Sequence, residues 1–338
     1  MSLDYPFDDT PAPGQPLEVA PGVRWLRMPL PFALDHINLW LLDDGDDVAI
    51  VDTGFGTPET QALWEEVLAA DGRRISGVVV THFHPDHLGL ATWLAARNDA
   101  PVFITEAEYL AARAVWHAVP GHAPGDMVAF FRRHGLDEER LAALAARGNT
   151  YARGVPELPR EHRRMFSGDR LTIGGRGWEI IVGHGHSPEH ASLYCAEAGL
   201  LISGDMLLPR ISTNVSVHAA NPMDDALGWF LCSLHRIKTL PDDTLVLPSH
   251  GKPFRGIRER IKELEAHHAD RCSALIEAMS QPVSAAQLLP TLFRRELDNH
   301  QVMFAMGETI AHLNHLQRRG SIRRIDEADG SIRYAHMR

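Results

Sequence analysis

The stretch Thr81-His82-Phe83-His84-Pro85-Asp86-His87-Leu88-Gly89 decides how the rest of this 338-residue chain is interpreted. Three histidines and a carboxylate follow directly after an apolar, β-branched run, residues 75–80, which is typical of a buried strand. Histidine is the commonest protein ligand for zinc-like ions, and mixed imidazole and carboxylate sets suit Zn²⁺ or Fe²⁺. The stretch therefore predicts a metal site at a strand end, with a solvent-exposed histidine-rich loop as the alternative.

The spacing within this stretch indicates more than one metal. Side chains two residues apart point the same way along a strand, so His82 and His84 should face one ion together. Asp86 and His87 follow one turn later, after Pro85 bends the chain, and can face a second ion. This spacing favours a ligand set divided between two metals over a single closed cage.

Composition and charge restrict the class of protein. With 44% hydrophobic and 23% charged residues, the chain has the composition of a soluble globular protein. Its length predicts one large domain and one small one. The net charge of −11 disfavours a general nucleic-acid binder and an anionic membrane surface as partner. We therefore expect a small-molecule substrate, and the sequence leaves homodimerisation open.

Cysteine usage and the N-terminus predict the compartment. The three cysteines, Cys195, Cys232 and Cys272, are far apart and form no CxxC motif, which fits a reducing environment. No apolar run approaches the roughly 20 residues of a transmembrane helix. The first residues lack the basic and apolar regions of a signal peptide. We expect a cytoplasmic protein.

The order of elements predicts an α/β layered fold. Residues 1–20 have the composition of an irregular arm, and residues 58–70 have helical periodicity with Thr57 as N-cap and Gly72 past the end. Residues 90–97 also have a helical pattern. Between residues 106 and 164 helical segments replace the strand pattern, and this insertion either shapes the site or only adds packing. Strands are expected at residues 23–28, 36–42, 48–51, 75–80, 101–104, 170–173, 178–182, 192–195, 200–202 and 244–247.

The C-terminal part has a different pattern. Helices are expected at residues 257–279, 284–292 and 300–319, after an earlier helix at 223–238, and a small hairpin follows at 321–334. Three helices and a hairpin resemble a winged-helix module. Its nearly balanced charge does not indicate a DNA-reading surface, whose footprint should be clearly basic. A lid or a dimerisation role is the better interpretation.

Three more strand ends carry residues of ligand type. The segment Gly183-His184-Gly185-His186-Ser187-Pro188-Glu189-His190 follows one expected strand, Ser203-Gly204-Asp205 a second, and Pro248-Ser249-His250-Gly251 a third. A single histidine of this kind is more often a hydrogen-bonded core residue. Four strand ends that converge on polar residues are how a layered α/β fold builds a pocket.

These motifs, in this order and preceded by Asp52-Thr53-Gly54, resemble those of the metallo-β-lactamase-fold hydrolase superfamily. The resemblance covers about residues 20–254. The C-terminal part resembles the extension of the glyoxalase-II-like, β-lactamase-like protein 2 type. The resemblance implies an αββα sandwich as catalytic domain (residues 1–254, with a helical insertion at about 106–165). It also implies a helical, winged-helix-like C-terminal domain (residues 255–338).

The resemblance also implies a ligand set for two metals. Among the histidines of the second motif, His186 is preferred because His-Ser-Pro-x-His-x-Ser aligns with the family's His-Thr-Pro-Gly-His-x-Ser, whose first histidine is the ligand. His184 and His190 remain the alternatives, and His190 and Asp52 are expected to support ligands from behind. The implied sites are His82, His84 and His186 for one ion and Asp86, His87 and His250 for the other, with Asp205 bridging them.

The chemistry implied is hydrolysis. Two ions, expected to be Zn²⁺ with Fe or Mn as options in either site, produce a hydroxide that attacks an activated carbonyl. Asp86 and Asp205 are the expected catalytic carboxylates, and no GxSxG nucleophile motif is present. A thioester of the acyl-CoA or glutathione type is the expected substrate. Arg210 and Asn214 are candidates for holding its carboxylate or phosphate, although a structural role is equally compatible with their positions.

Other functions remain as alternatives. Lactonases of this fold commonly carry a tyrosine three residues after the bridging aspartate, where this chain has Leu208. Phosphodiester or RNA cleavage uses the same metals, but the acidic charge counts against it. True β-lactamase activity and single-iron chemistry are disfavoured by Asp205 and by the complete second ligand set. A non-enzymatic binding role would predict a defective ligand set.

Overall fold

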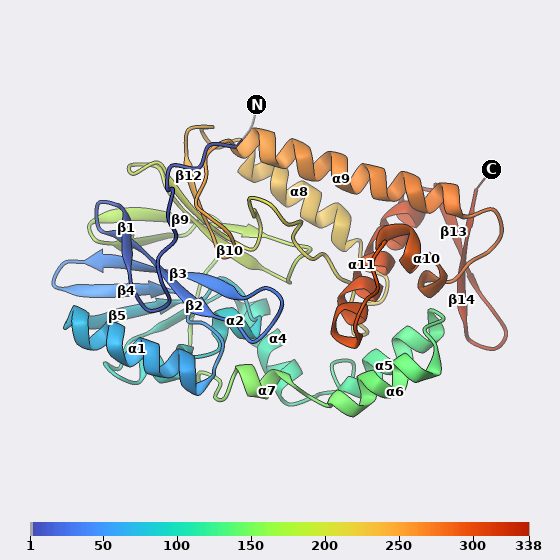
Figure 1. The fold of residues 1–338 in the computed structure, drawn as a ribbon, viewed down its shortest axis with the longest axis horizontal. Helices are drawn as coiled ribbons and strands as arrows, with labels where there is room; N and C mark the ends of the chain where they lie inside the picture. The colour runs from blue at the N-terminus through green and yellow to red at the C-terminus, as the bar shows by residue number, and fades with distance from the viewer. Residues whose placement is uncertain (1–2, 338) are drawn as a thin grey trace. The chain divides into compact units, whose positions relative to one another are not determined.

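The computed structural model describes residues 3–337, and the chain separates into two compact units (Figure 1). The sheet unit comprises the residues up to Arg113 together with 151–213 and 233–261. The helical unit comprises 114–150, 214–232 and the residues from Lys262 onward. The domain boundary expected at residues 254 and 255 stays a prediction.

The first sheet of the sheet unit has seven strands in sequence order. The first four are antiparallel neighbours, and β4 to β7 are parallel. Parallel pairing brings the carboxyl ends of β4 and β5 to one edge, so Asp52 and the histidine stretch, which follow these strands, become neighbours. The strands are β1 (Leu17–Ala20), β2 (Val23–Pro29), β3 (His36–Asp44), β4 (Asp47–Val51), β5 (Arg74–Val79), β6 (Val102–Ile104) and β7 (Arg163–Arg164).

The second sheet has five strands in the order β12-β11-β10-β9-β8. All neighbours are antiparallel except β11 and β12, which are parallel. The carboxyl ends of these two strands therefore meet, which places Asp205 and His250 close together in space. The strands are β8 (Arg170–Ile173), β9 (Arg176–Gly183), β10 (His190–Cys195), β11 (Leu200–Gly204) and β12 (Leu245–Pro248).

The two sheets pack face to face around one apolar core (Figure 1). Trp25 and Trp40 come from the first sheet and stack with ring centroids 6.4 Å apart, and Trp178 comes from the second. Alternate residues of each strand point into this layer, as expected for a half-buried sheet. Each fully buried large side chain contributes roughly 1.5–3 kcal/mol to folding.

Helices cover the outer faces of both sheets, which confirms the αββα arrangement. On the first sheet, α1 (Pro58–Asp71) begins at its predicted N-cap, where Thr57 accepts a hydrogen bond from the Thr60 amide. It is fixed to the strand ends by Trp64, whose indole donates to the Thr53 carbonyl at 2.8 Å. On the second sheet, Arg236 near the end of α8 (Ala226–Ile237) donates to the Val182 carbonyl at 3.0 Å.

The predicted insertion is helical. It begins with α4 (Glu106–Trp116), whose first part belongs to the sheet unit, and the chain returns to that unit in α7 (Tyr151–Gly154). Between them lie α5 (Pro124–Arg133) and α6 (Glu138–Arg147), which pack against each other in the helical unit.

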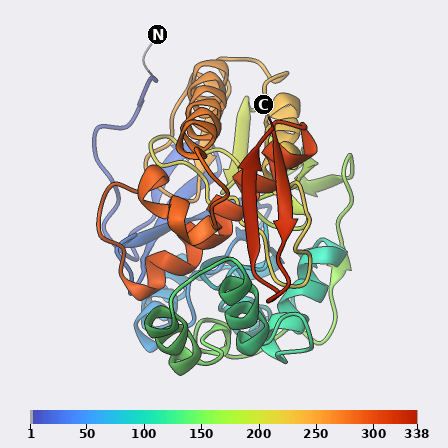
Figure 2. The same cartoon turned by 90° about the vertical axis from the view of Figure 1, so that its right-hand side faces the viewer.

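Three helices and a hairpin form the C-terminal part, as predicted from the sequence. Within the helical unit, α11 (Asn299–Arg318) packs against α10 (Ala285–Leu292) and against β13 (Ile322–Asp326) (Figure 2). The strand β14 (Ile332–His336) completes the hairpin, and α9 (Ile257–Ala278) leads into this part of the chain. No helix in residues 3–337 has the length and apolar character needed to cross a membrane.

One local expectation was wrong, and one expected helix is shorter than predicted. The arm expected to be irregular up to residue 20 contains β1, whose side chains are exposed or half-buried, so no apolar alternation marks it in the sequence. The helix expected at residues 90–97 is reduced to α3 (Ala91–Ala95), directly after the single turn α2 (Pro85–Leu88). The turn α2 carries Asp86 and His87, in agreement with the predicted change of direction at Pro85.

Candidate metal centre

Seven residues of ligand type converge at one edge of the sheet unit. They follow four strands, β5, β9, β11 and β12, whose carboxyl ends meet there. Most of their side chains are almost completely buried, and Asp86 is the most open of the carboxylates, with 18% of its side chain exposed. The seven residues are the predicted ligands His82, His84, Asp86, His87, His186, Asp205 and His250, and they form three overlapping groups whose ligand atoms lie within 4.8 Å of one another.

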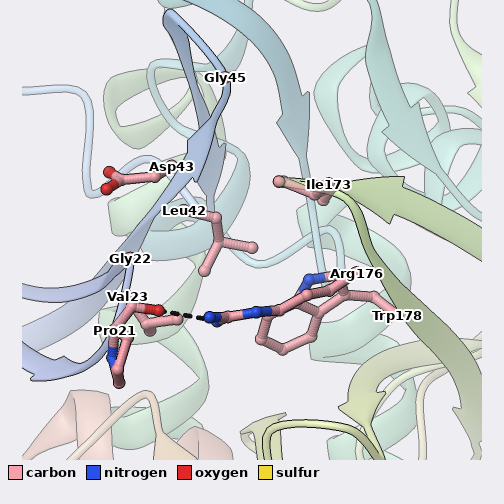
Figure 3. A pocket seen from close by; sticks show the side chains of 10 residues that line it. Pro21, Gly22, Val23, Leu42, Asp43, Gly45, Ile173, Arg176 and Trp178 are labelled. Atoms are coloured by element: carbon pink, nitrogen blue, oxygen red, sulfur yellow. Dashed lines mark hydrogen bonds between the residues drawn. The ribbon is translucent and has the colours of Figure 1, made fainter.

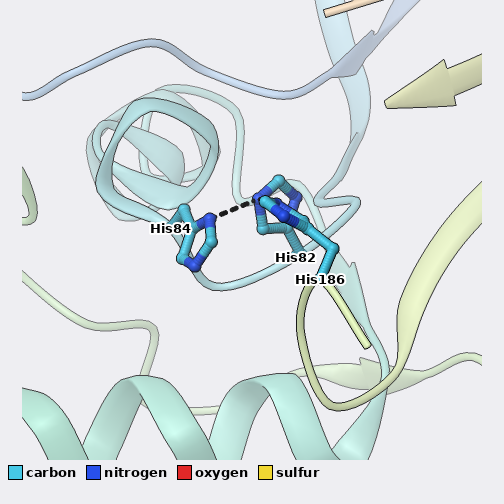
Figure 4. A group of neighbouring side chains, drawn as sticks. All are labelled: His82, His84 and His186. Atoms are coloured by element: carbon cyan, nitrogen blue, oxygen red, sulfur yellow. Dashed lines mark hydrogen bonds between the residues drawn. The ribbon is translucent and has the colours of Figure 1, made fainter. Parts of the chain in front are cut away.

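The first group consists of His82, His84 and His186 (Figure 4). His82 Nε2 lies 2.9 Å from His84 Nδ1 and 3.1 Å from His186 Nε2. Two ligands at about 2.1 Å from a tetrahedral zinc ion are separated by roughly 3.4 Å. The three imidazoles therefore have close to the spacing that a shared ion needs.

The second group consists of Asp86, His87 and His250. Asp86 Oδ2 lies 3.7 Å from His87 Nε2 and 3.6 Å from His250 Nε2. These separations are too long for good hydrogen bonds, but they suit atoms that share one cation.

Asp205 forms the third group with His82 and His87, and it turns one carboxylate oxygen toward each of the other two groups. Its Oδ2 is 3.4 Å from His186 Nε2 in the first group. Its Oδ1 is 3.6 Å from His87 Nε2 and 3.5 Å from His250 Nε2 in the second. Each oxygen of this carboxylate is therefore close enough to a different histidine group to share a cation with it.

Unpaired atoms at the centre agree with this interpretation. Within the described residues, His87 Nε2 and Asp205 Oδ1 are buried and have no hydrogen-bond partner. Buried polar atoms are rarely left in this state, because each lost hydrogen bond costs free energy. One cation between them would satisfy both atoms, so the residues fit a metal ion at this position.

Charge at the centre also favours cations. Burial alone would lower the pKa of His87, but nearby carboxylates, Asp52 first among them, raise it to about 10. Burial and the neighbouring imidazoles lower the pKa of His82 well below its usual value, so this ring is neutral and able to ligate. The ring of His82 is thus available as a neutral ligand, while the carboxylates create a negative field at His87 that favours positive charge.

Hydrogen bonds behind the ligands fix their ring orientation. Asp52 Oδ2 accepts a hydrogen bond from His87 Nδ1 at 2.8 Å, and its Oδ1 accepts one from the Thr81 amide at 2.8 Å. His250 Nδ1 donates to the His36 carbonyl at 2.8 Å. In both histidines the Nε2 atom is thereby directed toward the centre. Asp52 has a φ of 59°, a strained value for a non-glycine residue, and the hydrogen bonds that its carboxylate accepts from Thr81 and His87 hold it there.

The structure distinguishes the three histidines of the second motif. Only His186 belongs to a ligand group among the described residues. His184 Nδ1 donates to the Pro188 carbonyl at 2.7 Å instead. His190 Nε2 accepts a hydrogen bond from the backbone amide of Asp205 at 3.0 Å, so it lies behind the bridging residue.

The two candidate substrate-binding residues contact residues other than the ligands. The guanidinium of Arg210 is exposed and lies over the ring of Tyr5, 5.9 Å from its centroid. Asn214 belongs to the helical unit, where its Oδ1 accepts a hydrogen bond from Ser216 at 2.6 Å. Their role in substrate binding stays a prediction.

Sequence reasoning missed a buried carboxylate beside the centre. Glu108, in α4, is fully buried and accepts hydrogen bonds from the Phe83 amide, the Ser187 hydroxyl and the Glu189 amide. Burial raises the pKa of Glu108 to about 7, although these hydrogen bonds act to lower it. The segment 105–109 gives no local signal, because the partners of Glu108 are 25 to 81 residues away.

A separate cavity of about 260 Å³ lies in the sheet unit (Figure 3). It is lined by Val23, Leu42 and Trp178, and Arg176 donates to the Pro21 carbonyl at 2.7 Å beside it. Leu42 is six residues from His36 along β3, so the cavity is roughly 20 Å from the ligand cluster. None of its lining residues is a candidate ligand.

Comparison with known proteins agrees with this geometry. Residues 33–250 match the model of the metallo-beta-lactamase superfamily, and residues 272–337 match that of the metallo-beta-lactamase-like C-terminal domain. A crystal structure of a beta-lactamase domain protein from Burkholderia ambifaria is 48% identical in sequence. It superposes with a TM-score of 0.92 over 99% of this chain and 98% of that one.

Two curated proteins are more distant relatives. The probable metallo-hydrolase YqjP of Bacillus subtilis is 27% identical over 86% of this chain and 91% of its own length. The hydroxyacylglutathione hydrolase of Idiomarina loihiensis is 24% identical over 64% of this chain and 62% of its own length.

Proposed function

The chain belongs to the metallo-beta-lactamase superfamily, and from this premise we propose that it is a dinuclear-metal hydrolase acting on an activated carbonyl, most naturally a thioester. The observation that carries the proposal is the position of Asp205, which faces a histidine group with each of its two oxygens. A single-ion site would need only one of these groups.

The donor set indicates which metals to test. Five imidazoles and two carboxylates suit Zn²⁺ and Fe²⁺, and Mn²⁺ is the further candidate. Bound there, two divalent ions would lower the pKa of a shared water toward neutrality and polarise a carbonyl oxygen.

Residues of the chain supply the rest of the reaction. Asp205, and His190 behind it, hold the site in a fixed geometry, which reduces reorganisation during the reaction. Asp86 is the carboxylate with the most exposed side chain and is therefore best placed to accept the proton that the attacking water loses. Asp52 keeps His87 in the tautomer with Nδ1 protonated.

A thioester substrate is favoured over a lactone and a phosphodiester. Leu208, at the position where lactonases of this fold carry a tyrosine, is buried and cannot supply a hydroxyl. Hydroxyacylglutathione hydrolase, a relative by sequence, is named for a glutathione thioester. The net charge of −11 is unfavourable for binding a polyanionic nucleic acid.

Metal analysis followed by turnover assays tests the proposal. We expect two divalent ions per chain, and hydrolysis of an acyl-CoA or glutathione thioester that is lost on chelation and restored by Zn²⁺, Fe²⁺ or Mn²⁺. The panel includes a lactone, a cephalosporin and bis-p-nitrophenyl phosphate. Turnover of the phosphodiester alone, or of the lactone alone, would overturn the thioester assignment, and one ion or none would overturn the dinuclear site.

A further inference from the structure

The two ends of the helical insertion reach the turns that carry the candidate ligands His82, His84 and His186 in the sheet unit; these are called the ligand turns. Glu108, in the first turn of α4, and Tyr151, at the start of α7, both belong to the sheet unit, whereas residues 114–150 between them belong to the helical unit. Their side chains are buried and point to the same peptide segment.

That segment is Phe83, which lies between the ligands His82 and His84. Glu108 Oε2 accepts a hydrogen bond from the Phe83 amide at 2.9 Å. The Tyr151 hydroxyl donates to the Phe83 carbonyl at 2.5 Å. Both backbone groups of this residue are therefore held by side chains from the insertion, one from each end.

Glu108 also holds the second ligand turn of the first group. Its Oε1 accepts hydrogen bonds from the Ser187 hydroxyl and the Glu189 amide, both at 2.6 Å, on either side of Pro188 and directly after His186. The contact is reciprocal, because the Glu189 carboxylate accepts a hydrogen bond from the Ala107 amide in the first turn of α4 at 3.2 Å. One buried carboxylate thus connects the turns that carry all three histidines of the first group.

We propose that Glu108 and Tyr151 are positioning residues of the first metal site, through which the ends of the insertion pre-organise His82, His84 and His186. The inference rests on the proposed function, since it requires that these histidines bind a metal. It answers a question that the sequence left open: the insertion supports the site at its two ends in addition to any packing role. Contacts of this kind typically change metal affinity 10–100-fold when they are removed.

Substitutions that keep shape but remove acceptors or donors test the proposal. In Glu108→Gln one oxygen becomes an amide donor, which cannot accept from both turns, so one connection is broken. Tyr151→Phe removes only the hydrogen bond to the Phe83 carbonyl. The matched control is Tyr109→Phe, the neighbouring residue of the same helix, whose hydroxyl donates to the Pro159 carbonyl at 3.0 Å and contacts no ligand turn.

The measurement is Zn²⁺ affinity of the full chain by competition with a chromophoric chelator, made in the His250→Ala background, which removes one ligand of the second group so that binding at the first group dominates. We expect Glu108→Gln to weaken binding 10–100-fold, Tyr151→Phe by about fivefold, the effect of one neutral hydrogen bond, and Tyr109→Phe not at all. Urea unfolding of each metal-free variant provides a second readout, on which Glu108→Gln and Tyr109→Phe should differ much less than on affinity.

The outcomes separate this inference from the proposed function. Equal Zn²⁺ affinities for Glu108→Gln, Tyr151→Phe and Tyr109→Phe would overturn the positioning role while the dinuclear site stands. Failure of the unsubstituted protein to bind Zn²⁺ would overturn the proposed function itself. If Glu108→Gln does not fold, Tyr151→Phe, which changes a single hydroxyl, decides the question.

Discussion

Buried histidines gather in both units of this protein, but their surroundings differ. In the sheet unit they lie among the carboxylates of Asp52, Asp86 and Asp205. In the helical unit His268 Nδ1 lies 3.1 Å from His312 Nε2, and His312 Nδ1 donates to the Glu308 carbonyl at 2.8 Å.

Histidines paired with carboxylates in the sheet unit therefore differ strongly in pKa from His268 and His312 in the helical unit. Burial lowers the pKa of His268 to about 2 and that of His312 to about 4, because no carboxylate compensates for the loss of water. The carboxylate of Glu308 is bonded instead to Arg271, at 2.7 Å. All ligand groups found among residues 3–337 lie in the sheet unit. Carboxylates shared between imidazoles, rather than the number of histidines, therefore distinguish a metal site from a packed cluster.

Substitution of Asp205 or of a ligand histidine should have the largest effect on the centre in the sheet unit, because it removes a group that is expected to hold metal. We expect Asp205→Asn and His82→Ala each to lower turnover by at least about 100-fold, because several kcal/mol of metal-dependent stabilisation are lost. The measurements are steady-state turnover and metal content of the purified variants, with circular dichroism to verify the fold. His312→Gln is the control and should keep two ions; unchanged turnover in Asp205→Asn would show that the ligand assignment is wrong.

Removal of the Asp52 carboxylate, which is hydrogen-bonded to the ligand His87, should have an intermediate effect on metal affinity. Asp52→Asn keeps the shape of the side chain but removes the charge that orients His87, so we expect metal affinity to fall 10–100-fold. Chelator competition measures the change. The matched control is Asp71→Asn, whose carboxylate pairs with Arg73 away from the ligands and should leave affinity unchanged. Equal affinities for the two variants would contradict the orienting role of Asp52.

The buried histidines of the helical unit should make its folded state less stable as the pH falls. His134 is buried, neither of its ring nitrogens is hydrogen-bonded within the described residues, and burial, together with Arg324 and Arg133, lowers its pKa to about 3. As pH falls below about 6.5, the unfolded chain takes up the proton first. The contribution of His134 to stability is therefore complete above that pH and is lost between about pH 6.5 and 3.

This sensitivity can be measured by urea unfolding at pH 7.5 and 5.0, in the presence of a chelator so that metal binding does not contribute. We expect His134 to account for about 2 kcal/mol of the loss in unfolding free energy between these pH values. His134→Leu should reduce the loss by that amount, and an identical loss in both proteins would refute the assignment.

The sequence predicted the centre because its signals are local. The ligand-bearing segments follow strands, and strand ends of an α/β fold meet at a common edge, so the four segments could be placed together before any coordinates. The choice of seven residues within them came from the family resemblance, because spacing alone left His184, His186 and His190 open. Glu108 and Tyr151 could not be found in this way, because they act through the backbone of Phe83, and no pattern within their own helices indicates a distant peptide group as partner. The edge strand β1 was missed for a related reason, since its exposed side chains lack an apolar alternation.

Location of bound ions by anomalous X-ray scattering tests the central claim most directly. Crystals grown with Zn²⁺ and measured on either side of the zinc absorption edge should show two peaks per chain, one on each side of the Asp205 carboxylate and none at His268 or His312. A single peak, or a pair in which Asp205 contacts only one ion, would contradict the dinuclear assignment on which the proposed chemistry depends.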